Sequence, residues 1–246
     1  MPRHGDRIRA NDTSVDAPYR SWRKYLTRSN GPRNKVLSDI YGRFPCKTDD
    51  IKCLSQSTET FLEQTHKGIP PHNIVAIDPL VIPALDIVFD KEGLTYKNTN
   101  LTITGLKNQT ISDFKMDTAA KSVILTTKAD LHMSSDIIII FTKSSKSLEG
   151  HYTSQGSVLG TATYSYELKT GDDGVKRFDV GPETITCKVV GTPKVELNPE
   201  LAETLKKDEI IEKAFCKAVE EAYKHVVHNI RAAAKVIPAS SFFTNI

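Results

Sequence analysis

Four cysteines are the residues whose type and spacing most clearly predict chemistry in this chain. All of them follow residue 45: Cys46, Cys53, Cys187 and Cys216. An even number permits complete pairing, in any of three connectivities. Local pairing, Cys46 with Cys53 and Cys187 with Cys216, is the simplest, and it would indicate an oxidising, extracytosolic compartment. The alternative that the spacing leaves open is four buried free thiols in a cytosolic protein.

The sequence gives less support for a catalytic site than for disulfides. The sequence contains no G-x-S-x-G elbow, Walker loop, G-x-G-x-x-G or H-E-x-x-H motif. His225 and His228 could share one face of a helix, but basic neighbours make a metal there unattractive. Asp130 and His132 would point to the same side of a strand, as an ordinary surface pair does. We therefore predict no catalytic residue, no metal and no cofactor, and a binding protein rather than an enzyme.

Tyrosines within apolar strands offer a different chemistry, because a phenol hydroxyl can hydrogen-bond to the polar group of a ligand in an apolar cavity. The candidates are Tyr152, Tyr164 and Tyr166. Such residues more commonly belong to a core or a surface, so the pattern alone does not single one out.

The elements that would position these residues begin with a sheet. Between residues 74 and 190 the apolar residues alternate or form β-branched runs, over 94–104, 111–118, 121–132, 136–142, 147–153, 157–168 and 175–190. Turn signals separate the runs, among them Ser134-Ser135 and Gly171-Asp172-Asp173-Gly174. Because no helix intervenes, we expect an antiparallel sheet.

Two helices are predicted to flank the sheet. Residues 54–66 place Leu54, Phe61 and Leu62 near one face, directly after the first two cysteines. Over 210–236, apolar pairs recur about every four residues, so a wide arc of a helix about 40 Å long is apolar. A flat sheet could not cover that arc. We therefore predict an α+β fold in which a highly curved sheet wraps the long helix and leaves room for an apolar cavity.

The charge is distributed unevenly along the 246 residues. Residues 1–45 carry ten basic and four acidic residues, and the remainder is mildly acidic, so nothing favours a nucleic acid partner. No apolar run approaches the roughly 18 residues of a membrane helix, and we predict no membrane insertion. We expect residues 1–44 to be a disordered basic extension and residues 45–246 to form one monomeric domain.

The N-terminus does not show the basic and then apolar pattern of a signal peptide. Three explanations are open: a misassigned first exon, a tail that replaces a lost signal, or an intracellular protein. We favour the first, in which residues 1–44 are a gene-model artefact and secreted material begins near Cys46. In a secreted protein, Asn100 and Asn108 lie in glycosylation sequons.

Several sequence blocks carry a family resemblance. The stretch from Pro45-Cys46-Lys47 to Gly68-Ile69-Pro70 resembles the start of the insect haemolymph juvenile hormone-binding protein and takeout family. Further similar blocks are Ile77-Asp78-Pro79-Leu80, 105–114, Ala129-Asp130-Leu131-His132 and 226–243. The resemblance covers about residues 46–246, and blocks 105–114 and 226–243 are most similar to the lepidopteran carriers.

The resemblance implies a fold, a ligand and site residues. The fold is a long helix wrapped by a curved antiparallel sheet, related to tubular lipid-binding proteins, with disulfides Cys46–Cys53 and Cys187–Cys216. The ligand is juvenile hormone, a sesquiterpenoid methyl ester with an epoxide. By resemblance, Tyr164 meets the epoxide, Phe178 and Phe242 line the pocket, and the helix bearing Leu54, Phe61 and Leu62 forms a lid.

The leading hypothesis is thus a secreted haemolymph carrier that binds juvenile hormone or a similar sesquiterpenoid and shields it from hydrolysis. A second hypothesis is a takeout-like carrier of another lipid, such as a fatty acid or quinone. A third, from another class, is an interaction protein whose pocket is collapsed by large side chains.

Overall fold

The computed structural model of the protein describes residues 45–246, apart from 145 and 205–207. Helix α3 (Ile51–Thr65) precedes the strands, and helices α4 (Pro199–Thr204) and α5 (Asp208–Ala234) follow them. The strands are β1 (Leu80–Phe89), β2 (Leu94–Thr104), β3 (Thr110–Asp117), β4 (Ser122–Phe141), β5 (Lys146–Thr170) and β6 (Lys176–Leu197). Short 3-10 turns are η1 (Pro70–His72), η2 (Leu106–Asn108) and η3 (Ala239–Ser241). The predicted disordered extension over residues 1–44 lies outside the described residues.

The strands form one antiparallel sheet in the order β1-β2-β4-β5-β6. Strand β3 pairs with 122–128 of β4, and β2 pairs with 132–141 on the same edge. Irregularities interrupt the register in four places, including one between β5 and β6 beside Tyr164 and Tyr166. Such bulges bend a strand and increase its twist, so they help the long strands β4, β5 and β6 to curve.

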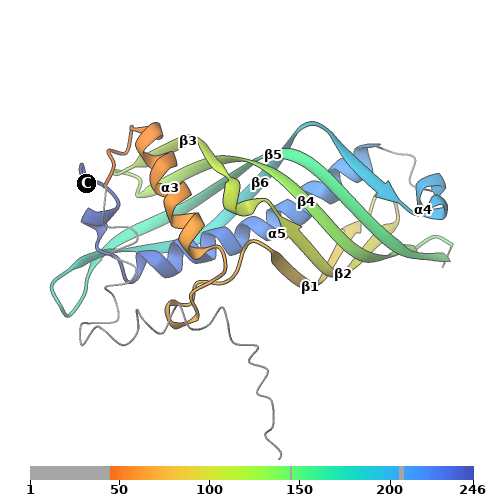
Figure 1. Ribbon diagram of the computed structural model, residues 1–246, viewed down its shortest axis with the longest axis horizontal. Coiled ribbons are helices and arrows are strands. Elements are labelled where there is room, and N and C mark those ends of the chain that lie inside the picture. Colours follow the sequence, from red (N-terminus) through yellow and green to blue (C-terminus); the bar gives the residue numbers. More distant parts are fainter. Residues whose placement is uncertain (1–44, 145, 205–207) are drawn as a thin grey trace, which may run out of the picture. The chain divides into compact units, whose positions relative to one another are not determined.

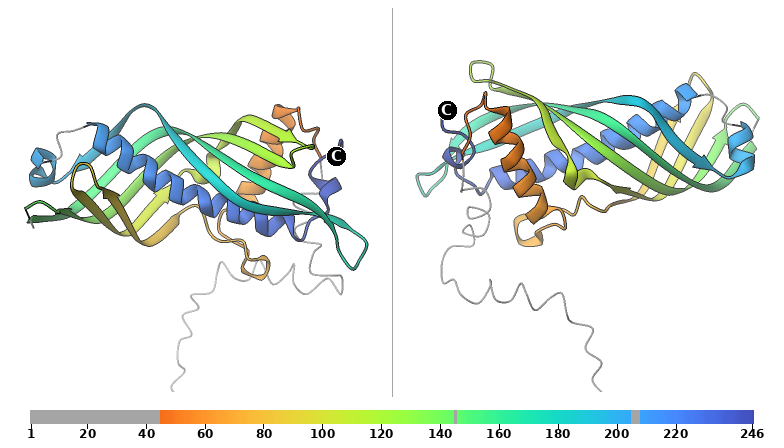
Figure 2. Two further views of the ribbon diagram at one scale, coloured as in Figure 1. Left: turned by 180° about the vertical axis from the view of Figure 1, so that it is seen from behind. Right: turned by 45° about the horizontal axis from the view of Figure 1, so that its top comes forward.

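Helix α5 lies along the concave face of this sheet, as both views in Figure 2 show. Its buried residues cover the wide arc that the sequence predicts, among them Phe215, Ala218, Val219, Ala222, Tyr223 and Val226. Figure 1 places α3 and the C-terminus at one end of the sheet and α4 at the other. The predicted architecture, a long helix wrapped by a curved antiparallel sheet with an N-terminal helix, is confirmed. Of the helices in the described part of the chain, none combines the length and apolarity needed to cross a membrane.

Some predicted strand boundaries were wrong. Ser134-Ser135 was expected to be a turn, but both residues pair within the continuous strand β4, and the Ser135 hydroxyl donates to Thr99 O at 3.1 Å. The runs 147–153 and 157–168 likewise join into β5. Strand β1 was not predicted. It contains Pro83 and lies at the edge of the sheet, where a missing N–H is tolerated, and its burial alternates irregularly.

Both predicted disulfides are present, and they connect different elements. Cys46–Cys53 holds the segment before α3 to its first turn, whereas Cys187–Cys216 joins β6 to α5. All four cysteines are therefore paired, which excludes four free thiols. Helix α3 begins at Ile51, three residues earlier than expected, because the Asp50 carboxylate caps it by accepting from Cys53 N–H at 3.0 Å.

Candidate functional site

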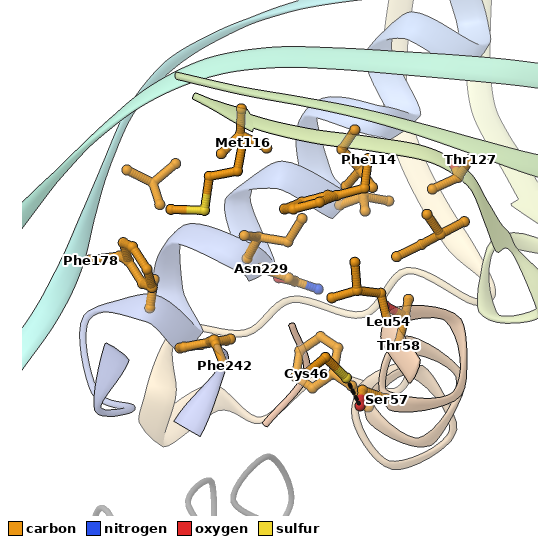
Figure 3. Close-up of a pocket in the computed structure, with 18 of the residues that line it drawn as sticks. Cys46, Leu54, Ser57, Thr58, Phe114, Met116, Thr127, Phe178, Asn229 and Phe242 are labelled. Atoms are coloured by element: carbon orange, nitrogen blue, oxygen red, sulfur yellow. Dashed lines mark hydrogen bonds between the residues drawn. The ribbon is translucent and has the colours of Figure 1, made fainter. Parts of the chain in front are cut away.

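An apolar cavity of about 170 Å³ lies where α3, β3, the inner face of the sheet and α5 meet. One water needs roughly 10–15 Å³ on this scale, so the cavity has room for a ligand of many atoms. In Figure 3, Leu54 and Thr58 of α3 face Phe114 and Met116 of β3 across this space. A continuous cavity of this kind is not the collapsed pocket of the third hypothesis.

The structure brings the predicted binding and lid residues together around this cavity. All six are among its lining side chains: Leu54, Phe61, Leu62, Tyr164, Phe178 and Phe242. They come from α3, two strands and the C-terminal segment, which are far apart in the sequence. Their contact with a ligand stays a prediction.

Tyr164 of β5 lines the cavity and is 8% exposed. Among the described residues, none forms a hydrogen bond with its hydroxyl. Burial raises the pKa of this phenol, so it stays protonated and able to donate. The neighbouring bulge of β6 is fixed by Arg231 of α5, which donates to Val180 O at 3.1 Å and Gly181 O at 2.8 Å.

The other two candidate tyrosines differ in position. Tyr166 lines the cavity and packs edge-to-face on Phe178, with ring centroids 5.4 Å apart. Tyr152 packs instead on a separate core cluster with Phe141 and Leu197. Only Tyr164 and Tyr166 of the three therefore reach the cavity.

Aromatic side chains close the end of the cavity near the C-terminus. Phe178 packs against Phe242, and Phe114 stacks on Phe243, with centroids 5.9 and 5.7 Å apart. Backbone hydrogen bonds from Cys46 N to Phe242 O and from Thr244 N to Cys46 O hold this segment beside the start of α3. The sequence analysis did not assign a cavity role to Phe114 or Phe243, although both lie within blocks that carry the family resemblance.

A buried polar cluster interrupts the apolar wall. Thr127 Oγ1 lies 2.8 Å from the Tyr223 hydroxyl and donates to Gln109 Oε1 at 3.0 Å. Gln109 Nε2 donates to Leu106 O at 2.9 Å. Gln109 and Thr127 line the cavity, and burial raises the pKa of Tyr223 to about 12. Sequence reasoning did not single out these residues.

Polar residues near the C-terminal end of α5 hold other backbone segments in place. Asn229 accepts from Val75 N–H at 2.9 Å and donates to Val75 O at 2.8 Å, so both ends of its amide are occupied. His228 Nε2 lies 2.9 Å from Asn73 O. These contacts fix the segment between α3 and β1, and they give the family-like block 226–231 a structural role.

The remaining candidates lie on the surface. Asp130 and His132 are exposed, and Asp130 accepts from the Ser157 hydroxyl. The side chains of Asn100 and Asn108 are also exposed, as glycosylation would require. In the part of the chain that the structure describes, no three His, Cys, Asp or Glu side chains group as metal ligands would.

Comparison with known proteins gives consistent results. A family model for haemolymph juvenile hormone binding protein matches residues 41–169. The juvenile hormone-binding protein of Manduca sexta is 48% identical over 228 residues, covering 86% of this chain and 100% of that protein. The crystal structure of Epiphyas postvittana takeout 1 matches with a TM-score of 0.68 at 18% identity, covering 82% of this chain and 99% of that chain. At 18% identity, the likeness to takeout 1 concerns the fold alone.

Proposed function

Because the chain belongs to the haemolymph juvenile hormone binding protein family, we propose that it is a secreted carrier of juvenile hormone. The observation that carries this proposal is the apolar cavity, to which Tyr164 contributes a hydroxyl that has no hydrogen-bond partner among the described residues. An apolar sesquiterpenoid with an epoxide suits such a cavity. The 48% identity to the Manduca sexta protein supports this ligand.

Apolar contact would supply most of the affinity. Removing terpenoid surface from water contributes roughly 25 cal/mol per Å². One hydrogen bond from Tyr164 adds only about 0.5–1.5 kcal/mol net, so its main effect is to orient the ligand and to favour an epoxide. Helix α3 forms one wall of the cavity and would act as its lid, hiding the ester from hydrolysis.

Replacing Tyr164 tests this proposal directly. We expect Tyr164→Phe to weaken hormone binding about two- to twelvefold, because one hydrogen bond is lost while the ring keeps its packing. Equilibrium binding of labelled hormone measures the change, and urea unfolding checks that the variant is folded. Tyr152→Phe is the matched control, since that ring lies outside the cavity. Equal affinities for Tyr164→Phe and the unmodified protein would refute the epoxide contact.

A carrier of another lipid is the second candidate, because an apolar lining accepts many chains of suitable width. A fatty acid or a quinone that displaces the hormone at equal or lower concentration would favour it. We further propose that the protein is not an enzyme. Incubation of the hormone with purified protein should return the hormone unchanged, and a hydrolysed product would contradict this.

A further inference from the structure

The buried cluster of Gln109, Thr127 and Tyr223 contains one hydrogen-bond donor without a partner among the described residues. All three side chains are at most 3% exposed. The Tyr223 hydroxyl can donate to Thr127, whose own hydroxyl donates to Gln109 Oε1. A glutamine amide carries two N–H donors, and one of them donates to Leu106 O. The second has no partner among the described residues, and a buried donor left unpaired is costly.

Neighbouring residues hold this amide in place. The Asp78 carboxylate accepts from Gly105 N–H at 3.1 Å and from Lys107 N–H at 2.9 Å, which fixes η2 directly before Gln109. Gly105 is required there, because a Cβ would lie 2.1 Å from Asp130 O. The unpaired N–H therefore belongs to a well-fixed side chain in the cavity wall.

The distance of this donor from Tyr164 follows from the strand register. Tyr164 pairs with Val123 of β4, four residues before Thr127 on the same inward face. Four residues along a strand span about 13 Å. Figure 3 shows Thr127 on the opposite side of the cavity from Phe178, which packs on Tyr166, two residues after Tyr164. Leu125 lines the cavity and lies between Val123 and Thr127 on β4, so the wall between the two donors is apolar there.

We propose that Gln109 donates its second amide N–H to the carbonyl oxygen of the bound ester, while Tyr164 donates to the epoxide. The cavity then selects extended apolar ligands that carry a hydrogen-bond acceptor near each end. This inference rests on the proposed carrier function. It adds a specificity residue and fixes the direction in which the ligand lies.

A ligand pair isolates the contact. The hormone is compared with a hydrocarbon analogue in which a propyl group replaces the methyl ester group, in the unmodified protein and in Gln109→Leu. We expect the ratio of the two Kd values to change two- to twelvefold between the proteins, because only the ester can use the donor. The ratio cancels any general effect of the substitution on the pocket. In the control, Tyr164→Phe should leave this ratio unchanged and alter the ratio between the hormone and its epoxide-free olefin.

Each other result has a defined meaning. An unchanged ratio of the Kd values for the ester and the hydrocarbon analogue in Gln109→Leu overturns the proposal. A change in the epoxide-to-olefin ratio in that variant also overturns it, because it would mean that the ligand lies the other way round. If Gln109→Leu does not fold, NMR of the isotope-labelled unmodified protein decides instead. The Gln109 side-chain amide protons should shift differently with the ester and with the hydrocarbon analogue, and equal shifts overturn the contact. Failure of the unmodified protein to bind the hormone at all would refute the proposed carriage of juvenile hormone itself.

Discussion

Tyr223 lies so close to Gly160 of the facing strand that no side chain fits between them. A Cβ at Gly160 would lie 2.3 Å from Cε1 of the Tyr223 ring. The backbone of Gly160 is ordinary strand, so space rather than conformation requires glycine here. Because Gly160 pairs with Thr127, this gap lets the tyrosine hydroxyl reach Thr127 and complete the polar cluster.

We expect Gly160→Ala to lower the free energy of unfolding by about 1–3 kcal/mol, since the new methyl group must displace the Tyr223 ring. Urea unfolding measures the loss. Gly156→Ala is the matched control: it lies on the same strand, but its Cβ would lie 3.2 Å from the Phe215 ring, which a small shift can relieve. Equal losses in both variants would show that the Tyr223 contact is not the cause.

The site could be predicted from the sequence only in part, and the polar cluster shows why. Tyr164, Phe178 and Phe242 followed from the family resemblance. The role of Gln109 depends on Thr127, 18 residues away, and on Tyr223, 96 residues beyond that, which only the folded chain brings together. A glutamine after a turn carries no local sign that its amide is buried.

At the scale of elements, periodicity predicted the type of each long segment better than its ends. The drifting apolar pairs of α5 predicted both a helix and a sheet curved around it, because the width of a buried arc is a property of the sequence. The continuity of β4 through Ser134 and Ser135 could not be predicted. It depends on cross-strand partners in β2 and β5, which pair with the backbone of residues that locally favour a turn.

The two disulfides should affect different properties, because they connect different elements. Replacing both Cys46 and Cys53 by serine removes a tether on α3 worth at most roughly 2.5 kcal/mol in the chain-entropy model. We expect ligand to dissociate several-fold faster, since the proposed lid opens more easily. Stopped-flow release of bound hormone into excess unlabelled competitor measures this rate.

The second disulfide supplies the control. Replacing Cys187 and Cys216 by serine breaks the disulfide between β6 and α5. This disulfide closes a longer loop and stabilises the fold by at most roughly 3.5 kcal/mol in the same model. That change should lower global stability to urea with less effect on release. An unchanged dissociation rate in the Cys46/Cys53 variant would contradict a lid role for α3.

At the scale of the molecule, the covering of the cavity matters more than any single contact. Helix α3, strand β3 and the C-terminal segment close over the ligand space, while Asn229 and Arg231 hold adjoining backbone to α5. Apolar burial needs no particular partner, so affinity depends on how completely this covering excludes water. Protection of the ligand would depend on the same covering.

We therefore expect bound hormone to be hydrolysed only after it leaves the protein. With carrier in excess, an added esterase should hydrolyse the hormone more slowly than it does without carrier. As more esterase is added, the rate of hydrolysis should rise to a plateau. The plateau arises because release becomes the limiting step once the esterase captures free hormone faster than the carrier rebinds it. The plateau rate should equal the dissociation rate measured independently, and it should rise by the same factor in the Cys46/Cys53 variant. A water-soluble ester, hydrolysed equally fast with and without the carrier, controls for inhibition of the esterase. Hydrolysis that instead keeps rising in proportion to esterase would mean that the enzyme reaches the ester while it is bound, and the proposed shielding by α3 would be wrong.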